Sequence, residues 1–292
     1  MLRPAWLVVP APNQDDLAQM QSMLNAGNLH TVCESANCPN IGECFSQKTC
    51  TFMILGNICT RNCRFCAVEH GQLPLPVDRE EPKAVALSAK QLNLAYVVVT
   101  SVTRDDLPDG GAAHFAKTIQ AIRQALPAAK VEVLIPDLLG QFASLRQIID
   151  AGPEVISHNI ETVPRLYKAV RPQAIYERSL QLLKRVNTSG KNIAKAGIML
   201  GLGEGHDEVL QTMVDIKAVG CRILTIGQYL RPSPQHHPIM EYIHPTTFKM
   251  WEEKAYEIGF NQVVSGPMVR SSYHAGQCYA KTFRSESKKS RR

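Results

Sequence analysis

Short β-branched runs alternate with helical segments along most of this 292-residue chain, and this alternation restricts the fold more than any other feature. Six runs have the length and composition of buried strands. They are residues 51–56, 95–102, 130–137, 154–161, 194–203 and 222–230. The segments between these runs place apolar residues at helical spacing. The pattern therefore predicts an α/β fold in which right-handed crossover helices connect parallel strands.

Six strand–helix units are two fewer than a complete eightfold barrel has, so we expect a partial (β/α)6 barrel. A doubly wound open sheet is the alternative, but cysteines, not a glycine-rich dinucleotide-binding turn, follow the first run. A chain of this length can form one main domain with short additions. The expected parts are an N-terminal extension (1–50), the barrel (51–262), a C-terminal segment (263–280) and a flexible basic tail (281–292).

Cysteine usage indicates metal binding. Seven of the nine cysteines lie between Cys33 and Cys66. An odd and crowded set does not suit a disulfide framework, and in a reducing, cytoplasmic compartment such a set is typical of metal sites. Cys59, Cys63 and Cys66 follow the first strand in the segment CTRNCRFC. At the carboxyl end of a barrel strand they would face the mouth where barrel enzymes keep their chemistry.

The spacing of these three cysteines predicts an iron-sulfur cluster with one open corner. A cubane cluster normally takes four thiolates, and this motif supplies three. The remaining iron could chelate the amino and carboxylate groups of S-adenosylmethionine, whose cleavage would give a 5′-deoxyadenosyl radical. The arrangement resembles the radical S-adenosylmethionine (radical SAM) superfamily, in which an aromatic residue, here Phe65, precedes the last cysteine.

Two alternatives to this interpretation are open. The three cysteines could bind structural zinc with His70 as a fourth ligand, although their spacing differs from the common paired zinc patterns. An electron carrier of the ferredoxin type is the other alternative. Such carriers use a different cysteine run, with a further ligand nearby, and do not need a barrel.

A second triplet, Cys33, Cys38 and Cys44, lies upstream in the segment CESANCPNIGEC. This segment, the radical motif and the C-terminal RSSYHAG together resemble the lipoyl synthase family, and the resemblance extends from RPAWL near the start to RSSYHAG. It implies an auxiliary 4Fe-4S cluster whose fourth ligand is Ser272. A hard oxygen ligand suits iron of a cluster less well than thiolate does, so this corner would open easily. Without the resemblance, RSSY would be interpreted as a surface turn.

The resemblance also implies a pocket for S-adenosylmethionine on loops that follow barrel strands. Ser101 would lie near the methionine amino group. Asn159, Glu161 and Arg171 would lie near the ribose and the carboxylate. The alternative for each residue is a loop side chain that caps a helix or pairs with a neighbour.

For function, the resemblance implies insertion of two sulfur atoms at carbons 6 and 8 of a protein-bound octanoyl-lysine, with two 4Fe-4S clusters and S-adenosylmethionine as cofactors. The implied substrates are octanoylated lipoyl carrier domains, which are the 2-oxoacid dehydrogenase E2 subunits and the glycine cleavage H protein. A ferredoxin or flavodoxin would be the reductant, and a cluster-repair protein would rebuild the auxiliary cluster. The alternative is another sulfur-inserting radical SAM enzyme similar to biotin synthase, which would not need the upstream triplet.

The remaining features indicate no further site. Cys50 and Cys221 are expected to pack as small apolar residues, with no further role assigned to Cys50. Cys278 follows RSSYHAG closely and could approach the auxiliary cluster, but a passive role is favoured. Residues 281–292 carry six basic residues and one acidic residue, and thus most of the net charge of +6, so nucleic acid is not an expected partner. No apolar run approaches the roughly 20 residues that cross a bilayer. GLGEG lacks the residues of a phosphate loop, and the prolines around His236 and His237 favour a shaped loop over a metal site.

Overall fold

The structure is a computed structural model that describes residues 2–71 and 74–289, with side chains as far as residue 282. The chain divides into two compact units. Val9–Glu154 forms the N-terminal unit. Val155–Arg292, together with Met1–Val8, forms the C-terminal unit. The division falls between two strands, and each unit contains four of the strands found among the described residues.

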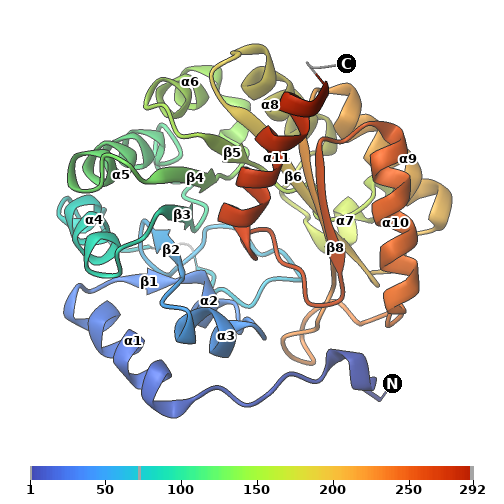
Figure 1. Cartoon of the computed structure of the whole chain (residues 1–292), viewed down its shortest axis with the longest axis horizontal. Helices are drawn as coiled ribbons and strands as arrows, with labels where there is room; N and C mark the ends of the chain where they lie inside the picture. The colour runs from blue at the N-terminus through green and yellow to red at the C-terminus, as the bar shows by residue number, and fades with distance from the viewer. Residues whose placement is uncertain (1, 72–73, 290–292) are drawn as a thin grey trace. The chain divides into compact units, whose positions relative to one another are not determined.

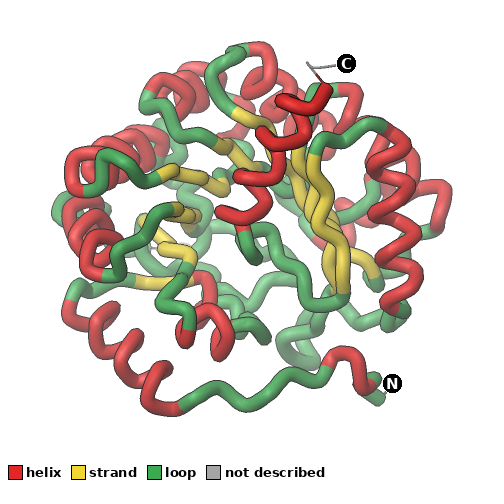
Figure 2. Tube along the Cα trace, viewed as in Figure 1, coloured by secondary structure: helices red, strands yellow, loops and turns green. Residues whose placement is uncertain are grey.

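The N-terminal unit begins with helices and continues as alternating strands and helices (Figure 1). Its elements are α1 (Gln14–Ala26), β1 (His30–Thr31), α2 (Val32–Ser35), α3 (Ile41–Ser46), β2 (Thr51–Ile54), α4 (Glu81–Gln91), β3 (Tyr96–Ser101), α5 (Ala112–Ala125), β4 (Lys130–Leu134), the 3-10 turn η2 (Leu138–Gly140) and α6 (Phe142–Asp150). Strand β1 pairs antiparallel with β2, whereas β2, β3 and β4 are parallel neighbours. The described residues of the loop between β2 and α4 form no helix or named strand (Figure 2).

Apolar spacing explains why the N-terminal unit forms these layers. Phe115, Ile119 and Ile122 of α5 are fully buried and recur at helical spacing, so they form one face of the helix. In β3, Val97 and Val99 are also fully buried. Because both faces of a parallel strand are covered, its sequence is an almost continuous apolar run. Helices α4, α5 and α6 pack one against the next.

The C-terminal unit repeats the pattern of parallel strands and helices. Its elements are η1 (Ala5–Leu7), β5 (Val155–Ser157), η3 (Pro164–Leu166), α7 (Tyr167–Val170), α8 (Tyr176–Thr188), β6 (Ile193–Leu200), α9 (His206–Ala218), β7 (Ile223–Gln228), α10 (Pro245–Ile258), β8 (Gln262–Gly266) and α11 (Ala275–Lys289). Strands β5 to β8 pair in parallel and in chain order. Helix α10 packs against β7 and β8, and also against α9.

Helix α11 differs from the crossover helices because it lies alongside the sheet after the last strand (Figure 1). Cys278 belongs to an apolar cluster with the first residues of β5, β6 and β7, which are Val155, Ile193 and Ile223. The helix therefore contacts the amino ends of these strands, opposite the carboxyl ends from which the loops with candidate site residues leave.

The predicted fold is confirmed. Each of the six predicted runs contains a strand, from β2 to β7, and all of the observed pairs of neighbours among these strands are parallel. Within each unit the strand order follows the chain, without the reversal that a doubly wound sheet requires. Strands β1 and β8 were not predicted. Helix α11 includes the first part of the basic segment expected to be a flexible tail, and residues 290–292 lie outside the described part of the chain.

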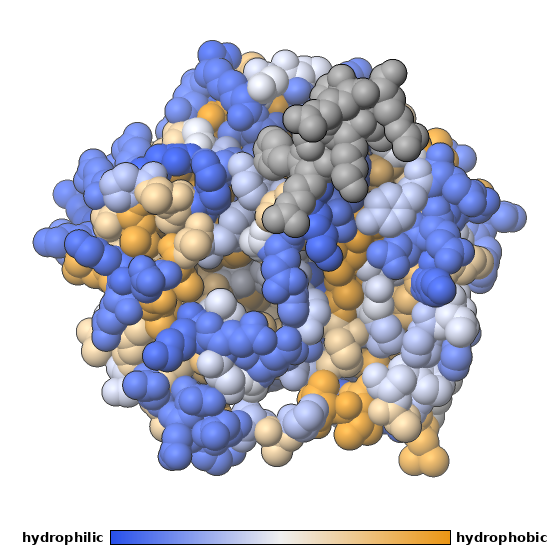
Figure 3. Space-filling view, in the orientation of Figure 1, coloured by the Kyte–Doolittle hydropathy of each residue, from blue (hydrophilic) through white to orange (hydrophobic). Residues whose placement is uncertain are grey.

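Exposed apolar side chains occur near the N-terminus of the chain. On the face in Figure 3, hydrophobic surface gathers near the N-terminus, where Leu2, Trp6 and Val8 are exposed. Trp6 also makes an edge contact with His244. Among the described helices, none combines the length and the apolar composition that a bilayer crossing requires.

Candidate active site

The loop after β2 holds Cys59, Cys63 and Cys66, all of them half-buried. It is closed by backbone hydrogen bonds at its first cysteine: Cys59 N donates to Glu69 O (2.8 Å), and Gly71 N donates to Cys59 O (2.9 Å). Cys66 N donates to Cys63 O (3.1 Å), which places the two cysteines on one tight turn around Phe65. The three predicted ligands therefore belong to one closed loop at the carboxyl end of β2.

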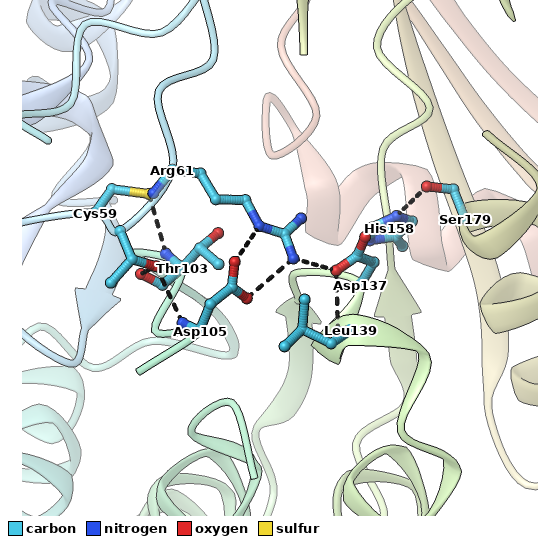
Figure 4. A network of polar contacts seen from close by, with 9 residues as sticks. Cys59, Arg61, Thr103, Asp105, Asp137, Leu139, His158 and Ser179 are labelled. Carbon is cyan, nitrogen blue, oxygen red and sulfur yellow. Dashed lines mark hydrogen bonds and ion pairs between the residues drawn. The ribbon is translucent and has the colours of Figure 1, made fainter. Parts of the chain in front are cut away.

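Cys59 Sγ accepts two backbone hydrogen bonds, from Arg61 N (3.4 Å) and Thr103 N (3.3 Å), as Figure 4 shows. Thr103 belongs to the loop after β3, and Thr60 N also donates to Thr103 O (3.0 Å). Backbone donors directed at sulfur favour a negatively charged ligand, because hydrogen bonds to the charged form stabilise it. The surroundings of Cys59 thus fit a thiolate bound to a cluster.

The zinc alternative requires the three cysteines and His70 to meet at one point. Within the described residues, no three His, Cys, Asp or Glu side chains converge on a position for a single metal ion. His70 is exposed, and its backbone forms a β-bridge with Cys59. A cubane differs from a single ion because its thiolates bind separate irons and surround the cluster.

The second triplet lies on consecutive turns before β2. Cys33 is buried in the first turn of α2, where the Thr31 side chain accepts a hydrogen bond from Glu34 N (3.3 Å). Cys38 N donates to Cys33 O (3.0 Å), and Cys44 lies in α3. Burial raises the pKa of Cys33 to about 12, with further increases from the nearby Cys38 and Cys44. The three cysteines therefore lie within one short segment, and their assignment as ligands of a cluster remains a prediction.

The other cysteines pack as predicted. Cys50, Cys221 and Cys278 are each less than a tenth exposed, and burial raises the pKa of both Cys50 and Cys221. The cysteines that the structure describes form no disulfide. Their environments are therefore those of small apolar side chains.

Three of the predicted cofactor-binding residues meet in the C-terminal unit. Asn159 and Glu161 follow β5, and Asn159 Nδ2 donates to Glu161 Oε1 (3.1 Å). Arg171, buried at the end of α7, donates from Nη1 to Asn159 O (3.0 Å), Ile160 O (2.9 Å) and Tyr167 Oη (3.1 Å). Burial raises the pKa of Glu161. The charge of Arg171, the hydrogen bond from Asn159 and the charge of Arg270 partly offset this increase.

Several buried side-chain oxygens among the described residues have no hydrogen-bond partner, and two of them belong to predicted cofactor-binding residues. Asn159 Oδ1 and, in the N-terminal unit, Ser101 Oγ are buried without a hydrogen-bond partner. Buried polar atoms usually find partners, so an unpaired one indicates a missing group. Gly197 of β6 leaves room beside Asn159, because a Cβ there would lie 2.7 Å from Asn159 Oδ1 and from Thr225 Oγ1. Within the C-terminal unit, Asn159 Oδ1 can therefore accept a hydrogen bond from a polar ligand. The assignment of Ser101, Asn159, Glu161 and Arg171 to S-adenosylmethionine remains a prediction.

The RSSY segment leads from β8 into α11. A Cβ at Gly227 would lie 2.2 Å from Val269 O, so only glycine allows the backbone before Arg270 to approach β7 this closely. Ser272 O accepts a hydrogen bond from Ala275 N (3.3 Å), and His274 has a positive φ of 52°. Ser272 therefore lies in a defined turn. Its assignment as a cluster ligand remains a prediction.

In two loops, GLGEG and the loop with His236 and His237, the polar groups make hydrogen bonds within the protein. The Glu204 carboxylate accepts hydrogen bonds from Gly201 N and Leu202 N. These backbone amides of GLGEG are therefore not available to bind a phosphate. His237 Nε2 lies 3.0 Å from Leu202 O, and His236 Nδ1 lies 2.8 Å from Ser233 Oγ. Both histidines therefore support the loop structure, as predicted.

Sequence reasoning missed the ionic network around the radical motif. Arg61 is buried against Asp105 and Asp137, at distances of 2.6 Å each (Figure 4). The same figure also labels His158 and Ser179 of the C-terminal unit, which form a buried contact of 2.9 Å. The only available signal for the network was the position of these aspartates just after predicted strands.

Comparisons with known proteins define the class first. Residues 53–216 match the model of the Radical SAM superfamily, which covers more than half of the chain. A hydrogenase maturase (HydG) has a similar fold, with a TM-score of 0.57 at 16% identity, over 87% of this chain and 56% of that one. Methylornithine synthase gives a TM-score of 0.51 at 13% identity, over 81% and 65%. The chain is a radical SAM protein, a class that holds a 4Fe-4S cluster and S-adenosylmethionine.

Closer relatives identify the family. A lipoyl synthase from Caldanaerobacter subterraneus subsp. tengcongensis is 57% identical over 274 residues, or 94% of this chain and 95% of the relative. A lipoyl synthase from Chromobacterium violaceum is 52% identical over 275 residues, or 94% and 87%. The chain belongs to the lipoyl synthase family and is a sulfur-inserting radical SAM enzyme.

Proposed function

We propose that this enzyme inserts sulfur at carbons 6 and 8 of an octanoyl chain carried on a protein lysine, using two 4Fe-4S clusters. Membership of the lipoyl synthase family implies octanoylated carrier domains as substrates. The observation that carries the two-cluster proposal is the presence of two separate cysteine triplets in the N-terminal unit, one before β2 and one after it. Each triplet is one thiolate short of a complete cubane.

The chain's own residues have distinct proposed roles. Cys59, Cys63 and Cys66 hold the radical cluster, and the backbone amides of Arg61 and Thr103 stabilise the Cys59 thiolate. When bound, this cluster supplies the electron that cleaves S-adenosylmethionine to a 5′-deoxyadenosyl radical. Ser101 binds the amino group of the methionine part in this proposal, which its buried, unpartnered Oγ supports. Asn159, Glu161 and Arg171 serve the ribose and carboxylate.

Cys33, Cys38, Cys44 and Ser272 are the proposed ligands of the auxiliary cluster. Buried thiols keep their protons until metal binds, so the raised pKa of Cys33 means that cluster assembly must release protons there. The serine corner is the proposed point of opening, because oxygen is a poorer partner than thiolate for cluster iron. Since sulfur donation consumes this cluster, we propose a repair protein and a ferredoxin or flavodoxin reductant as partners.

The decisive experiment is a mass measurement. Anaerobically reconstituted enzyme is incubated with an octanoyl-lysine peptide, S-adenosylmethionine and a reductant. We expect the peptide to gain two sulfurs and, in its disulfide form, to lose two hydrogens. A Cys38→Ala variant should still form 5′-deoxyadenosine but no thiolated peptide, whereas an enzyme similar to biotin synthase would not depend on Cys38. Fewer than two clusters per chain, by iron and sulfide analysis, would contradict the proposal.

A further inference from the structure

Arg61 occupies an unusual position in the radical motif. It lies between the first two cluster cysteines, yet its side chain is only 4% exposed, whereas Arg64 in the same motif is exposed. Long charged side chains are almost never fully buried unless they are paired. The burial of Arg61 therefore requires an explanation in terms of its partners.

Two carboxylates hold the Arg61 guanidinium. Nε donates to Asp105 Oδ2 (2.6 Å), and Nη2 donates to Asp105 Oδ1 (3.0 Å) and to Asp137 Oδ1 (2.6 Å). The pair with Asp105 is a bidentate fork, which is the strongest geometry available to an arginine and a carboxylate. Nε and Nη2 of Arg61 therefore donate to protein carboxylates, and this pair of donors is not available to bind a substrate carboxylate.

The partners come from two different loops of the same unit. Asp105 follows β3, and Asp137 follows β4. Both are fixed in turn: Asp105 N donates to Thr60 Oγ1 (3.0 Å), and Asp137 Oδ1 accepts from Leu139 N (3.1 Å). The guanidinium therefore joins the cluster loop to the loops after β3 and β4 (Figure 4).

The contacts of Arg61 with Asp105 and Asp137, called the Arg61 junction below, are ionic. The buried guanidinium pairs with both carboxylates, at 2.6 Å from Asp105 and 2.6 Å from Asp137. Hydrogen bonds between charged groups are shorter and stronger than those between neutral groups. Removal of one partner would leave buried charge uncompensated, which strongly favours the intact junction.

The backbone of Arg61 is what the junction positions. Arg61 N donates to Cys59 Sγ at 3.4 Å, and Thr103 N, two residues before Asp105, donates to the same sulfur at 3.3 Å. The side-chain fork from Arg61 to Asp105 thus spans the two segments that supply these amides. Hydrogen bonds to ligand sulfurs are among the factors that set the reduction potential of iron-sulfur clusters.

We propose that Arg61 is a positioning residue for the radical cluster: its fork to Asp105 and Asp137 keeps two backbone N–H groups directed at Cys59 Sγ. This inference rests on the proposed binding of a cluster by the three cysteines. Donors that favour negative charge on the sulfur stabilise the reduced, more negative cluster. Their loss should therefore lower the reduction potential and weaken retention of iron.

The test compares Arg61→Met, Arg61→Lys and the matched control Arg64→Met in the full chain. The cluster is followed by the paramagnetic resonance signal that changes when S-adenosylmethionine is added, during a potentiometric titration. We expect Arg61→Met to lower the potential and to lose iron to a chelator about 10-fold faster or more. Lysine keeps the charge but lacks the fork, so it should give an intermediate result. Arg64→Met should match the parent protein.

The inference would be overturned if folded Arg61→Met had the same reduction potential and the same rate of iron loss as the parent protein. Should this variant not fold, as judged by circular dichroism, Asp105→Asn replaces it. That change preserves side-chain shape and weakens one arm of the fork, and parent values for it would equally overturn the inference. A parent protein without any signal responsive to S-adenosylmethionine would instead contradict the proposed function, so the two failures are distinguishable.

Discussion

The backbone amide of Leu55 donates a hydrogen bond of 2.8 Å to the buried carboxylate of Glu81. Leu55 directly follows β2 and has a φ of 70°, in the left-handed region that a bulky residue rarely adopts. Its carbonyl accepts from Arg104 Nη1 (3.2 Å), so both of its backbone polar groups are held. His114 Nε2 lies 2.6 Å from the same Glu81 oxygen. The turn that leads into the cluster loop is therefore held by partners outside it.

Glu81→Ala should destabilise the protein because it leaves the Leu55 amide and the His114 ring without their buried acceptor. Buried groups that lose a partner cost up to a few kcal/mol each, so we expect the free energy of unfolding to fall by about 3 kcal/mol. Chemical denaturation of the cluster-free chain measures this change. Glu80→Ala is the matched control, because Glu80 is exposed and adjacent. Equal stability of the two variants would contradict the role of Glu81.

Gly197→Ala should impair the cofactor pocket while leaving the fold intact. The added methyl group would lie 2.7 Å from Asn159 Oδ1 and must displace that side chain. A displacement of this size typically costs on the order of 100-fold in rate, so 5′-deoxyadenosine formation should fall by that factor. Gly205→Ala serves as a control, because the nearest atom to its added carbon would be 3.4 Å away. Parent activity in Gly197→Ala would remove Asn159 from the pocket.

Glu208 should contribute acid-sensitive stability. The side-chain hydrogen bonds of Arg165, followed by the amide of Gly205, lower the pKa of Glu208 from 4.5 to about 2. A depressed pKa in the folded state means that the stabilisation is present above pH 4.5 and is lost as pH falls toward 2. The melting temperature of Glu208→Gln should thus be lower than that of the parent at neutral pH and converge with it in acid.

The Glu208 effect should also be small and sensitive to salt. The side chains of Arg165 and Glu208 are 58% and 32% exposed, so solvent screens the pair. The difference should shrink in about 1 M salt, where screening acts over a few ångströms. Glu177→Gln, an exposed residue in the first turn of α8, is the control. A pH-independent difference between parent and Glu208→Gln would contradict the assigned pKa.

Ser272→Ala should separate the two halves of the reaction. The variant should still cleave S-adenosylmethionine, because the radical motif is unchanged, but it should fail to thiolate the octanoyl peptide. Ser271→Ala is the neighbouring control and should form product. Normal product formation by Ser272→Ala would refute the ligand assignment.

Local patterns explain which parts of the fold were predictable. The six predicted strands are short runs rich in apolar and β-branched residues, and burial on both faces gives this signal. Strand β1 has two residues and depends on antiparallel pairing with β2, for example His30 with Met53. Strand β8 is a run of five residues that ends in Ser265 and Gly266, and it is only partly buried. Strand β1 is too short to show a pattern of its own, and β8 lacks the deep burial that gives the other strands their apolar sequences.

The candidate site shows the same limit. The cysteines of the radical motif were found because cluster ligands gather in one short segment with characteristic spacing. Ser272 was found only through family resemblance, because a serine in a turn has no distinguishing signal. The left-handed Leu55 was missed because such a conformation normally indicates glycine or asparagine. Asp105 and Asp137 were missed as partners of Arg61 because pairing between distant residues leaves no trace in a single sequence.

The partners of Arg61 lie 44 and 76 residues away along the chain. Closing loops of that length carries an entropic penalty that only a folded strand framework can offset. A synthetic peptide with the octet CTRNCRFC would contain every thiolate of the radical site but none of this support. Peptide maquettes built on the motif should therefore ligate iron less selectively than the intact chain, and maturation of the cluster should follow formation of β3 and β4 rather than precede it.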